Sequence, residues 1–565
     1  MYRNQESGPV SHPMFEQHRK TLDAACNAIR ERGYWSAYPE VPSGKIYGES
    51  AKDEGLANFQ ARLNKPFALE GQPGEVGRIG NEKSPYGPAL GVTYPKSDLD
   101  ALLRASQHAM AGWRDASVEA RIGVCLEILH RLNRRSFELA NAVMHTTGQG
   151  FMMAFQAGGP HAQDRGLEAV AYAYDEMKRT PETATWRKQV GKEEFVTLEK
   201  RYRIMPRGVA LTIGCSTFPT WNGYPGIFAS LATGNSVVVK PHPGAILPLA
   251  ITVEIARDVL KEAGFDPNVI TLLADSIDEP ITKDVAIRPE VRLIDYTGGP
   301  EFGAWLEKTA TQAVVLTEKA GVNTMILDSC DDLRAVTGNL AFSLCLYSGQ
   351  MCTTPQNIFI PKDGIHVGGE KKSFDDVAGA IVKAVDWMLS DPRRATEVLG
   401  AIQNDRTVLR IAQAAGEGAE ILRESAKMAN EAFPDASVHT PLILKTDGAR
   451  KDLFMREMFG PISYIIATDS TDQSVRLAAE GATQCGAITA GIYSTDEATL
   501  TKAVDALTEA GAATSCNLSG QIFVNQAAAF SDFHVSGGNP AGNATLCDSA
   551  FVSRRFSVVQ SRICV

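Results

Sequence analysis

The sequence lacks the features that would direct a protein into a membrane or onto a nucleic acid. No apolar run among its 565 residues approaches the roughly 20 residues that cross a bilayer. The first residues are polar and lack the apolar core of a signal peptide. The net charge of −10 gives no reason to expect attraction to nucleic acid or to an anionic membrane. We therefore expect a cytoplasmic protein with neither kind of partner.

Metal-ligand spacing is also missing. Ten cysteines are scattered from Cys26 to Cys564, and no two of them form a CxxC pair or cluster with histidine. Reduced thiols and no metal site are the expectation for a cytosolic protein. Internal repeats and low-complexity tracts are absent as well, which argues against a solenoid or a disordered chain.

What is present is the composition of a globular protein, with 44% hydrophobic and 22% charged residues. The length allows two to four domains. Residues 1–85 read as an N-terminal extension with one amphipathic helix over 15–32, followed by stretches rich in proline and glycine. Residues 97–179 have helical periodicity, including a single long helix predicted over 121–146. The sequence does not reveal what the extension covers.

From Val209 onward, short apolar runs alternate with helical stretches. This alternation predicts a parallel sheet with helices on both faces and ligands at the carboxyl ends of its strands. A second series of strands and helices follows Cys352, so the fold class is α/β with two domains in tandem. The predicted strands cover 209–213, 236–240, 269–273, 291–296, 324–327, 357–360, 464–468 and 490–493. The predicted helices cover 248–263, 374–389, 407–416 and 497–510.

Cys352 is the strongest candidate for chemistry. It lies beside Gly349, Gln350 and two threonines, where the backbone can approach a ligand closely. Cys345 sits in a more apolar run and reads as a core residue, the usual fate of a free cysteine. Glu318 follows an apolar run and offers a carboxylate that can act as a general base. A thiol and a carboxylate are what the covalent oxidation of an aldehyde requires.

Three other features carry weaker signals. Gly298 and Gly299 follow a strand and open a helix, where exposed amides favour an anion such as pyrophosphate. No GxGxxG fingerprint accompanies them, and an ordinary strand-to-helix turn is the favoured explanation of an isolated glycine pair. Lys240 ends a strand, where it can meet a ribose or phosphate, although a solvated lysine is the more common outcome. Glu318 alone would read as a surface carboxylate.

Taken together, these motifs resemble the NAD(P)-dependent aldehyde dehydrogenase superfamily from about residue 86 to the C-terminus. Within it, the N-terminal extension and residues 217–225 are similar to the PaaN type of phenylacetate degradation. The resemblance implies two tandem α/β domains with Rossmann-like parallel sheets and a small β oligomerisation element. Its domains would be an extension over 1–85, a cofactor-binding domain over 86–316 and a catalytic domain over 317–539. Residues 540–565 and about 190–205 would contribute to a homodimer or homotetramer.

The resemblance also assigns roles to single residues. Cys352 would be the nucleophile and Glu318 the general base, which also favours an acid product over a coenzyme A thioester. Phe530 and Phe533 would line the substrate tunnel, whereas the neighbouring His534 reads as a structural histidine. The cofactor would be held by Lys240, His242, Thr297, Gly298, Gly299, Glu457 and Phe459.

Two positions depart from the family pattern. Thr217 stands where the family has an asparagine that donates to the oxyanion, so Thr217 is predicted to supply this hydrogen bond. Asn222, five residues further along, is the less favoured alternative donor. In a third alternative, the backbone amide of Cys352 provides more of the oxyanion stabilisation. Pro243 stands where NAD-preferring members often have a glutamate. With Lys240 and His242 this predicts a cationic surface without an acid, and favours NADP over NAD.

The expected reaction is the NAD(P)-dependent oxidation of an aldehyde through a thioester on Cys352. The substrate would be a semialdehyde of aromatic or phenylacetate degradation, which could be linked to coenzyme A. One alternative is a dehydrogenase that transfers the acyl group to coenzyme A. Another is a nucleotide-binding relative with impaired catalysis, which only Thr217 favours.

Overall fold

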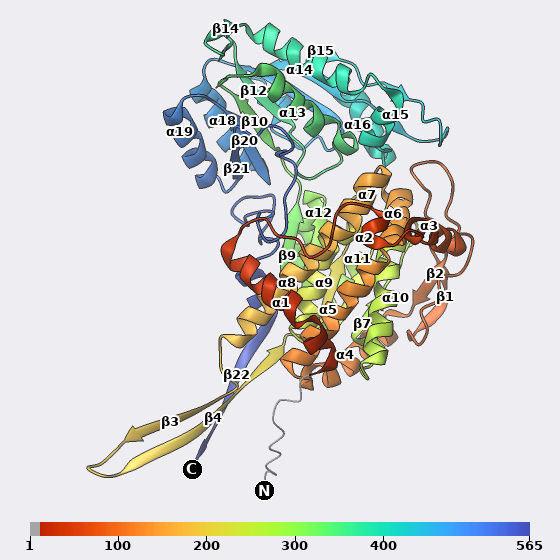
Figure 1. Ribbon diagram of the computed structural model, residues 1–565, viewed down its shortest axis with the longest axis vertical. Coiled ribbons are helices and arrows are strands. Elements are labelled where there is room, and N and C mark those ends of the chain that lie inside the picture. The colour runs from red at the N-terminus through yellow and green to blue at the C-terminus, as the bar shows by residue number, and fades with distance from the viewer. Residues whose placement is uncertain (1–11) are drawn as a thin grey trace.

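The computed structural model describes residues 12–565 (Figure 1). Two α/β units lie one above the other, and a narrow β-ribbon projects from the lower unit. The segment after the last strand of the upper unit runs back between the two units toward the N-terminal helix. No helix among the described residues is long and apolar enough to cross a membrane.

The first sheet has five parallel strands in the order β7-β6-β5-β8-β9. Its inner strands are buried apolar runs because helices cover both faces. The chain leaves β5 in one direction and later returns to its other side, which places a crevice at the carboxyl ends of the strands. The bounds are β5 (Val209–Ile213), β6 (Val237–Lys240), β7 (Ile270–Leu272), β8 (Val291–Gly298) and β9 (Val314–Lys319). The predicted strands of this unit are thereby confirmed.

The helices of this unit match the predicted helical region, with one correction. The helix predicted over 121–146 is two helices, because the chain leaves helical geometry at Arg135 (φ −105°, ψ 19°). Buried residues continue on both sides of this break, so periodicity alone does not show it. The helices are α4 (Leu99–Asp115), α5 (Val118–Arg134), α6 (Ser136–Thr147), α7 (Phe151–Gly158), α8 (Pro160–Lys178), α9 (Pro219–Ala232), α10 (Leu247–Glu262), α11 (Thr282–Ala286) and α12 (Pro300–Thr309).

The second sheet has seven strands in the order β15-β18-β19-β12-β10-β20-β21, and all are parallel except the edge strand β15. The strands are β10 (Thr324–Leu327), β12 (Asn357–Pro361), β15 (Glu420–Arg423), β18 (Leu442–Asp447), β19 (Ile462–Thr468), β20 (Thr489–Tyr493) and β21 (Ala513–Cys516). Its helices are α13 (Leu333–Cys345), α14 (Phe374–Met388), α15 (Pro392–Leu399), α16 (Asp405–Ala415), α17 (Lys451–Phe454), α18 (Thr471–Cys485) and α19 (Glu497–Glu509). The predicted α/β class with two tandem units is confirmed. The predicted boundary at 316/317 falls inside β9.

The N-terminal extension packs into the first unit. Helix α1 (Pro13–Glu31) contacts α5 and α8, and its residues Phe15, Leu22 and Ile29 are buried in the same core as those helices. The predicted helix over 15–32 is therefore confirmed. The extension also contains α2 (Gly44–Tyr47), α3 (Ala51–Arg62), β1 (Glu75–Ile79) and β2 (Tyr94–Ser97).

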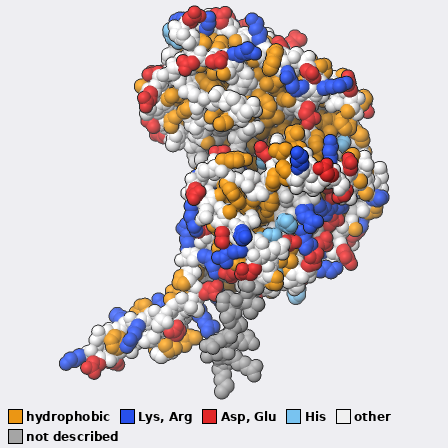
Figure 2. Space-filling model, in the orientation of Figure 1, with side chains coloured by type: hydrophobic (Ala, Val, Ile, Leu, Met, Phe, Trp, Pro, Cys, Tyr) orange, Lys and Arg blue, Asp and Glu red, His pale blue; other side chains and the backbone are white. Residues whose placement is uncertain are grey.

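The projecting ribbon joins segments that are far apart in the sequence. Strands β3 (Thr183–Gln189), β4 (Phe195–Pro206) and β22 (Phe556–Cys564) form one antiparallel sheet in the order β22-β4-β3. Figure 2 shows charged and hydrophobic side chains side by side along it. Trp186, Phe195, Val559 and Ile563 are all exposed there. Smaller elements complete the chain: β11 (Ser329–Cys330), β13 (Ile365–Val367), β14 (Glu370–Lys372), β16 (Lys427–Met428), β17 (Val438–His439) and α20 (Ser549–Ser553).

Candidate active site

A strained turn after α13 presents Cys352. Tyr347, Ser348 and Gly349 all have positive φ, at 55°, 48° and 64°. Such a conformation persists only where the surroundings enforce it. The Ser348 hydroxyl donates to the carbonyls of Leu399 and His439, at 3.0 and 2.9 Å. The turn therefore has a single geometry, and that geometry aims the following residues into the site.

Two further contacts fix the nucleophile relative to its neighbours. A Cβ on Gly349 would lie 2.4 Å from the carbonyl oxygen of Gly460, so glycine is required where these two backbones meet. Asn323 Nδ2 donates to the carbonyl of Cys352 at 2.7 Å. Cys352 is half-buried, whereas Cys345 is fully buried in the core, as its apolar context predicts.

Glu318 lies near the end of β9 and is buried. Asn222, in α9, donates from Nδ2 to Glu318 Oε2 at 2.8 Å. His534 Nε2 lies 2.7 Å from Glu318 Oε1. Both carboxylate oxygens are therefore held, which fixes the direction in which this base faces. Asn222 therefore hydrogen-bonds to Glu318, a contact that sequence reasoning missed.

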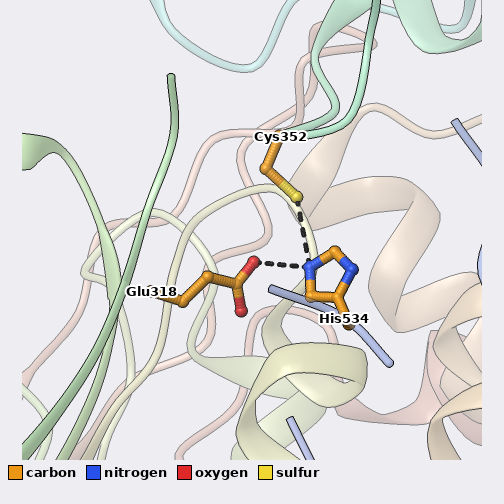
Figure 3. A group of neighbouring side chains, drawn as sticks. All are labelled: Glu318, Cys352 and His534. Carbon is orange, nitrogen blue, oxygen red and sulfur yellow. Dashed lines mark hydrogen bonds and ion pairs between the residues drawn. The ribbon is translucent and has the colours of Figure 1, made fainter. Parts of the chain in front are cut away.

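His534 lies between Glu318 and Cys352 (Figure 3). Its Nε2 is also 3.7 Å from Cys352 Sγ. A carboxylate oxygen of Glu318, the sulfur of Cys352 and a ring nitrogen of His534 all lie within 4.8 Å of one another. The ring packs edge-on against Trp221, with centroids 4.7 Å apart. The prediction that His534 is a structural residue stays a prediction, but its ring nitrogen lies against both Cys352 and Glu318, which the sequence did not indicate. The contact spans 216 residues of sequence, which no local pattern reveals.

The environment keeps the Cys352 sulfur protonated at rest. Burial raises the pKa of the Cys352 thiol well above its usual value, and the charge of Glu318 adds to this effect. Cys215 lies nearby with a pKa raised to about 11 by burial. Any reaction of Cys352 as a nucleophile therefore requires the loss of this proton.

Thr217 lies on the loop before α9. Its carbonyl accepts from Gln149 Nε2 at 2.8 Å. Its role toward an oxyanion stays a prediction.

Lys240 is buried at the end of β6, and its Nζ lies 2.7 Å from Asp275 Oδ1. Burial, together with the Lys240 charge, lowers the pKa of His242 to about 4, so this imidazole is neutral near pH 7. The prediction of a cationic surface without an acid is therefore wrong. The acid comes from the neighbouring strand rather than from position 243, and sequence adjacency did not show it.

The remaining cofactor candidates occupy positions that fit a dinucleotide. Thr297 and Gly298 end β8, and Gly299 precedes the first turn of α12 with no atom within 4 Å of a Cβ placed on it. The amides at this helix start are thus open to a pyrophosphate. Glu457 and Phe459 line a cavity together with Cys352, and burial raises the pKa of Glu457 to about 7. A second cavity is lined by Thr297, Asn222 and Glu318.

The two aromatic residues predicted for the substrate tunnel lie in different environments. Phe530 is fully buried in the core and packs edge-on against Trp35 at 4.8 Å. Phe533 is 49% exposed, with the Arg32 guanidinium 3.9 Å from its ring centroid. Phe530 is therefore a packing residue, and only Phe533 is open to an incoming molecule.

A buried carboxylate and a histidine lie against a thiol between two α/β units, an arrangement suited to covalent catalysis by the thiol. The family model described as "Aldehyde dehydrogenase family" matches residues 92–545. The chain belongs to the aldehyde dehydrogenase family and is an aldehyde dehydrogenase.

Solved structures and sequence relatives agree with this assignment. The crystal structure of an NAD-dependent aldehyde dehydrogenase from Burkholderia multivorans has a TM-score of 0.97 and 57% identity, covering 98% of this chain and 100% of that one. A Thermus 1-pyrroline-5-carboxylate dehydrogenase with bound NAD shares the fold, with a TM-score of 0.72 and 17% identity over 94% of this chain and 99% of that one. The N-succinylglutamate 5-semialdehyde dehydrogenase of Paraburkholderia xenovorans (strain LB400) is 28% identical over 414 residues, 71% of this chain and 77% of that protein.

Proposed function

We propose that this enzyme uses NAD to oxidise a semialdehyde to the carboxylic acid. The observation that carries the proposal is the contact of Cys352, His534 and Glu318, with Asn222 holding the other oxygen of the base. Such an arrangement supplies both a nucleophile and a positioned base for hydrolysis.

In this proposal Cys352 loses its proton toward His534 and Glu318, and its sulfur adds to the aldehyde carbon. The electrons of the carbonyl move to oxygen, where the Cys352 amide and the Thr217 hydroxyl are the proposed donors. A nicotinamide dinucleotide, when bound, supplies the acceptor for the hydride that leaves this carbon. Glu318 then takes a proton from water, which attacks the thioester, breaks its carbon–sulfur bond and releases Cys352.

Asp275 supports NAD over NADP. Its carboxylate, paired with Lys240, is suited to accept hydrogen bonds from ribose hydroxyls and to repel a 2′-phosphate. The Burkholderia multivorans relative is itself named as NAD-dependent.

We predict that Asp275→Ser moves the enzyme toward NADP. The ratio of kcat/KM with NAD to kcat/KM with NADP should fall by about tenfold to hundredfold, because a hydrogen bond to a charged group contributes about 1.5–3 kcal/mol. Steady-state kinetics with both dinucleotides measure this ratio. Asp278→Ser is the matched control, since Asp278 is exposed three residues away and should leave the ratio unchanged. An unchanged ratio in Asp275→Ser would refute the role of this carboxylate.

The semialdehyde is supported by sequence relatives whose names specify N-succinylglutamate 5-semialdehyde, among them those of Paraburkholderia xenovorans and Burkholderia ambifaria. The relatives reported above carry no phenylacetate or PaaN name, so that finer assignment stays a prediction. The proposal is therefore a semialdehyde in general.

Transfer of the acyl group to coenzyme A is the alternative outcome. We expect NADH to form from a semialdehyde without coenzyme A, with the free acid as the product by mass spectrometry. Added coenzyme A should change neither rate nor product, because Glu318 is held in place to activate water. Turnover that requires coenzyme A would establish the acylating reaction. An absence of turnover with every aldehyde would overturn the proposed function.

We also propose a homodimer or homotetramer built on the ribbon of β3, β4 and β22. The exposed Trp186, Phe195, Val559 and Ile563 support it, because apolar side chains gathered on a projecting surface favour association.

A further inference from the structure

We propose that Arg165 and Arg32 form a binding site for the carboxylate at the far end of the substrate, so that the enzyme selects aldehydes with an anionic terminus. This inference rests on the proposed function and names the group that this enzyme recognises beyond the aldehyde. The two arginines come from different parts of the chain, α8 and the end of α1 in the N-terminal extension.

Both arginines hold the segment that carries His534. Arg32 Nη2 donates to the carbonyl of Ser531 at 3.1 Å, and Arg165 Nη1 donates to the carbonyl of Asp532 at 3.1 Å. Two residues further along, His534 reaches Glu318 and Cys352. The arginine pair is thus connected to the reacting groups through one short stretch of backbone.

The pair has more positive charge than its surroundings neutralise. Glu168 is fully buried and its two oxygens are shared, with Oε2 at 2.8 Å from Arg165 and Oε1 at 3.3 Å from Arg32. The Asp532 carboxylate accepts from the amide of Ala528 instead. One carboxylate between two guanidinium groups leaves one uncompensated positive charge, which is costly where the side chains are buried. An anion from the substrate would compensate it.

The arginines also have free donors. Within residues 12–565, Arg165 Nε and Nη2 and Arg32 Nε are buried without a hydrogen-bond partner. Arg165 is fully buried. Buried donors are rarely left unpaired, so these groups call for a ligand or water. Nε and Nη2 of one guanidinium form a single edge, and a planar carboxylate matches two parallel N–H groups of this kind.

A line of contacts leads from this edge to the nucleophile. The Arg165 guanidinium lies 5.0 Å from the centroid of the Trp221 ring, and Trp221 packs against His534 at 4.7 Å. His534 Nε2 lies 3.7 Å from Cys352 Sγ. Trp221 is half-buried. Trp221 and His534 therefore connect Arg165 to Cys352, and the proposed site places the far end of the aldehyde at Arg165, with its chain along Trp221.

The test compares three aldehydes of equal chain length, one with a terminal carboxylate, one with the methyl ester and one with a plain alkyl end. The wild type should prefer the carboxylate in kcat/KM by about tenfold to hundredfold, as expected for hydrogen bonds to a charged group. Arg165→Met should abolish this preference, and Arg32→Met should reduce it in part. Because the ratio is measured within one variant, a loss of folded protein does not change it.

Arg257→Met is the matched control. Arg257 is also a buried arginine that donates to backbone carbonyls, including that of Ile270 at 3.0 Å, but it lies in α10. This variant should leave the preference intact. Arg32, whose side chain is 22% exposed, provides a second variant if Arg165→Met does not fold.

Binding of a dicarboxylate, measured by isothermal titration calorimetry, tests the site without catalysis. It should weaken by about tenfold or more in Arg165→Met. Equal oxidation of all three aldehydes by the wild type would overturn the anion site while leaving the proposed function intact. If no aldehyde is oxidised, the proposed function fails, and the calorimetric comparison still decides whether Arg165 binds a carboxylate.

Discussion

Cys352→Ala is expected to lower kcat for aldehyde oxidation by roughly 10⁴-fold or more, the range seen when a catalytic nucleophile is removed. Only a thiolate can form the thioester of the proposed mechanism, and an alanine leaves nothing at that position to attack the aldehyde. The assay is NADH formation under steady-state conditions. Incubation with aldehyde, followed by intact-protein mass spectrometry, should show an acyl adduct in the wild type and none in the variant.

Cys345→Ala is the control for this result. Cys345 is fully buried in α13, so its loss should reduce stability by about 1 kcal/mol without changing kcat. Full activity in Cys352→Ala would contradict the covalent mechanism, whereas equal losses in both variants would indicate damage to the fold.

The same thiol gives the enzyme a direction of pH dependence. Burial, with the charge of Glu318, raises the pKa of Cys352, so the reactive thiolate becomes more abundant as pH increases. Alkylation of Cys352 by iodoacetamide in the free enzyme should accordingly speed up toward alkaline pH. His534 Nε2, which lies beside the sulfur, is hydrogen-bonded to the Glu318 carboxylate, so Glu318 is the base in line to receive this proton.

The part of the site that could be predicted from the sequence consists of residues in recognisable local patterns. Cys352 is marked by its glycine-rich, polar neighbours, and Glu318 by the apolar strand before it. Asn222 and His534 carry no such mark, because each reaches Glu318 only after distant segments pack together. A lone histidine near aromatic residues is most often structural, and only the tertiary contact with Glu318 and Cys352 makes His534 a candidate for a further role.

The fold follows the same division. The strands of the first sheet were predictable because parallel strands buried on both faces are continuous apolar runs. The carboxylate beside Lys240 was not predictable from the sequence. Asp275 follows β7, which lies next to β6 in the sheet, and it pairs with Lys240 at the end of β6. The expectation of a surface without an acid was wrong at this point for a physical reason, since the charge at a sheet edge is set by neighbouring strands.

Glu318→Gln is expected to separate the two halves of the reaction. The glutamine keeps a side chain of the same shape beside Asn222 and His534 but cannot accept a proton from water. The thioester should then form and persist. Stopped-flow measurements should show a burst of NADH of about one per active site, followed by steady turnover roughly 10²–10⁴-fold slower than in the wild type.

The variant His534→Ala separates the role of His534 from that of Glu318. This variant keeps the Glu318 carboxylate and its bond from Asn222, but removes the ring between the carboxylate and Cys352. We expect slower attack by the thiol and therefore a slower burst phase, with hydrolysis less affected than in Glu318→Gln. Turnover of Glu318→Gln at the wild-type rate and without a burst would mean that another group activates water. His534 is the candidate for that group, because its ring lies 3.7 Å from the Cys352 sulfur, where the thioester forms in the proposed mechanism.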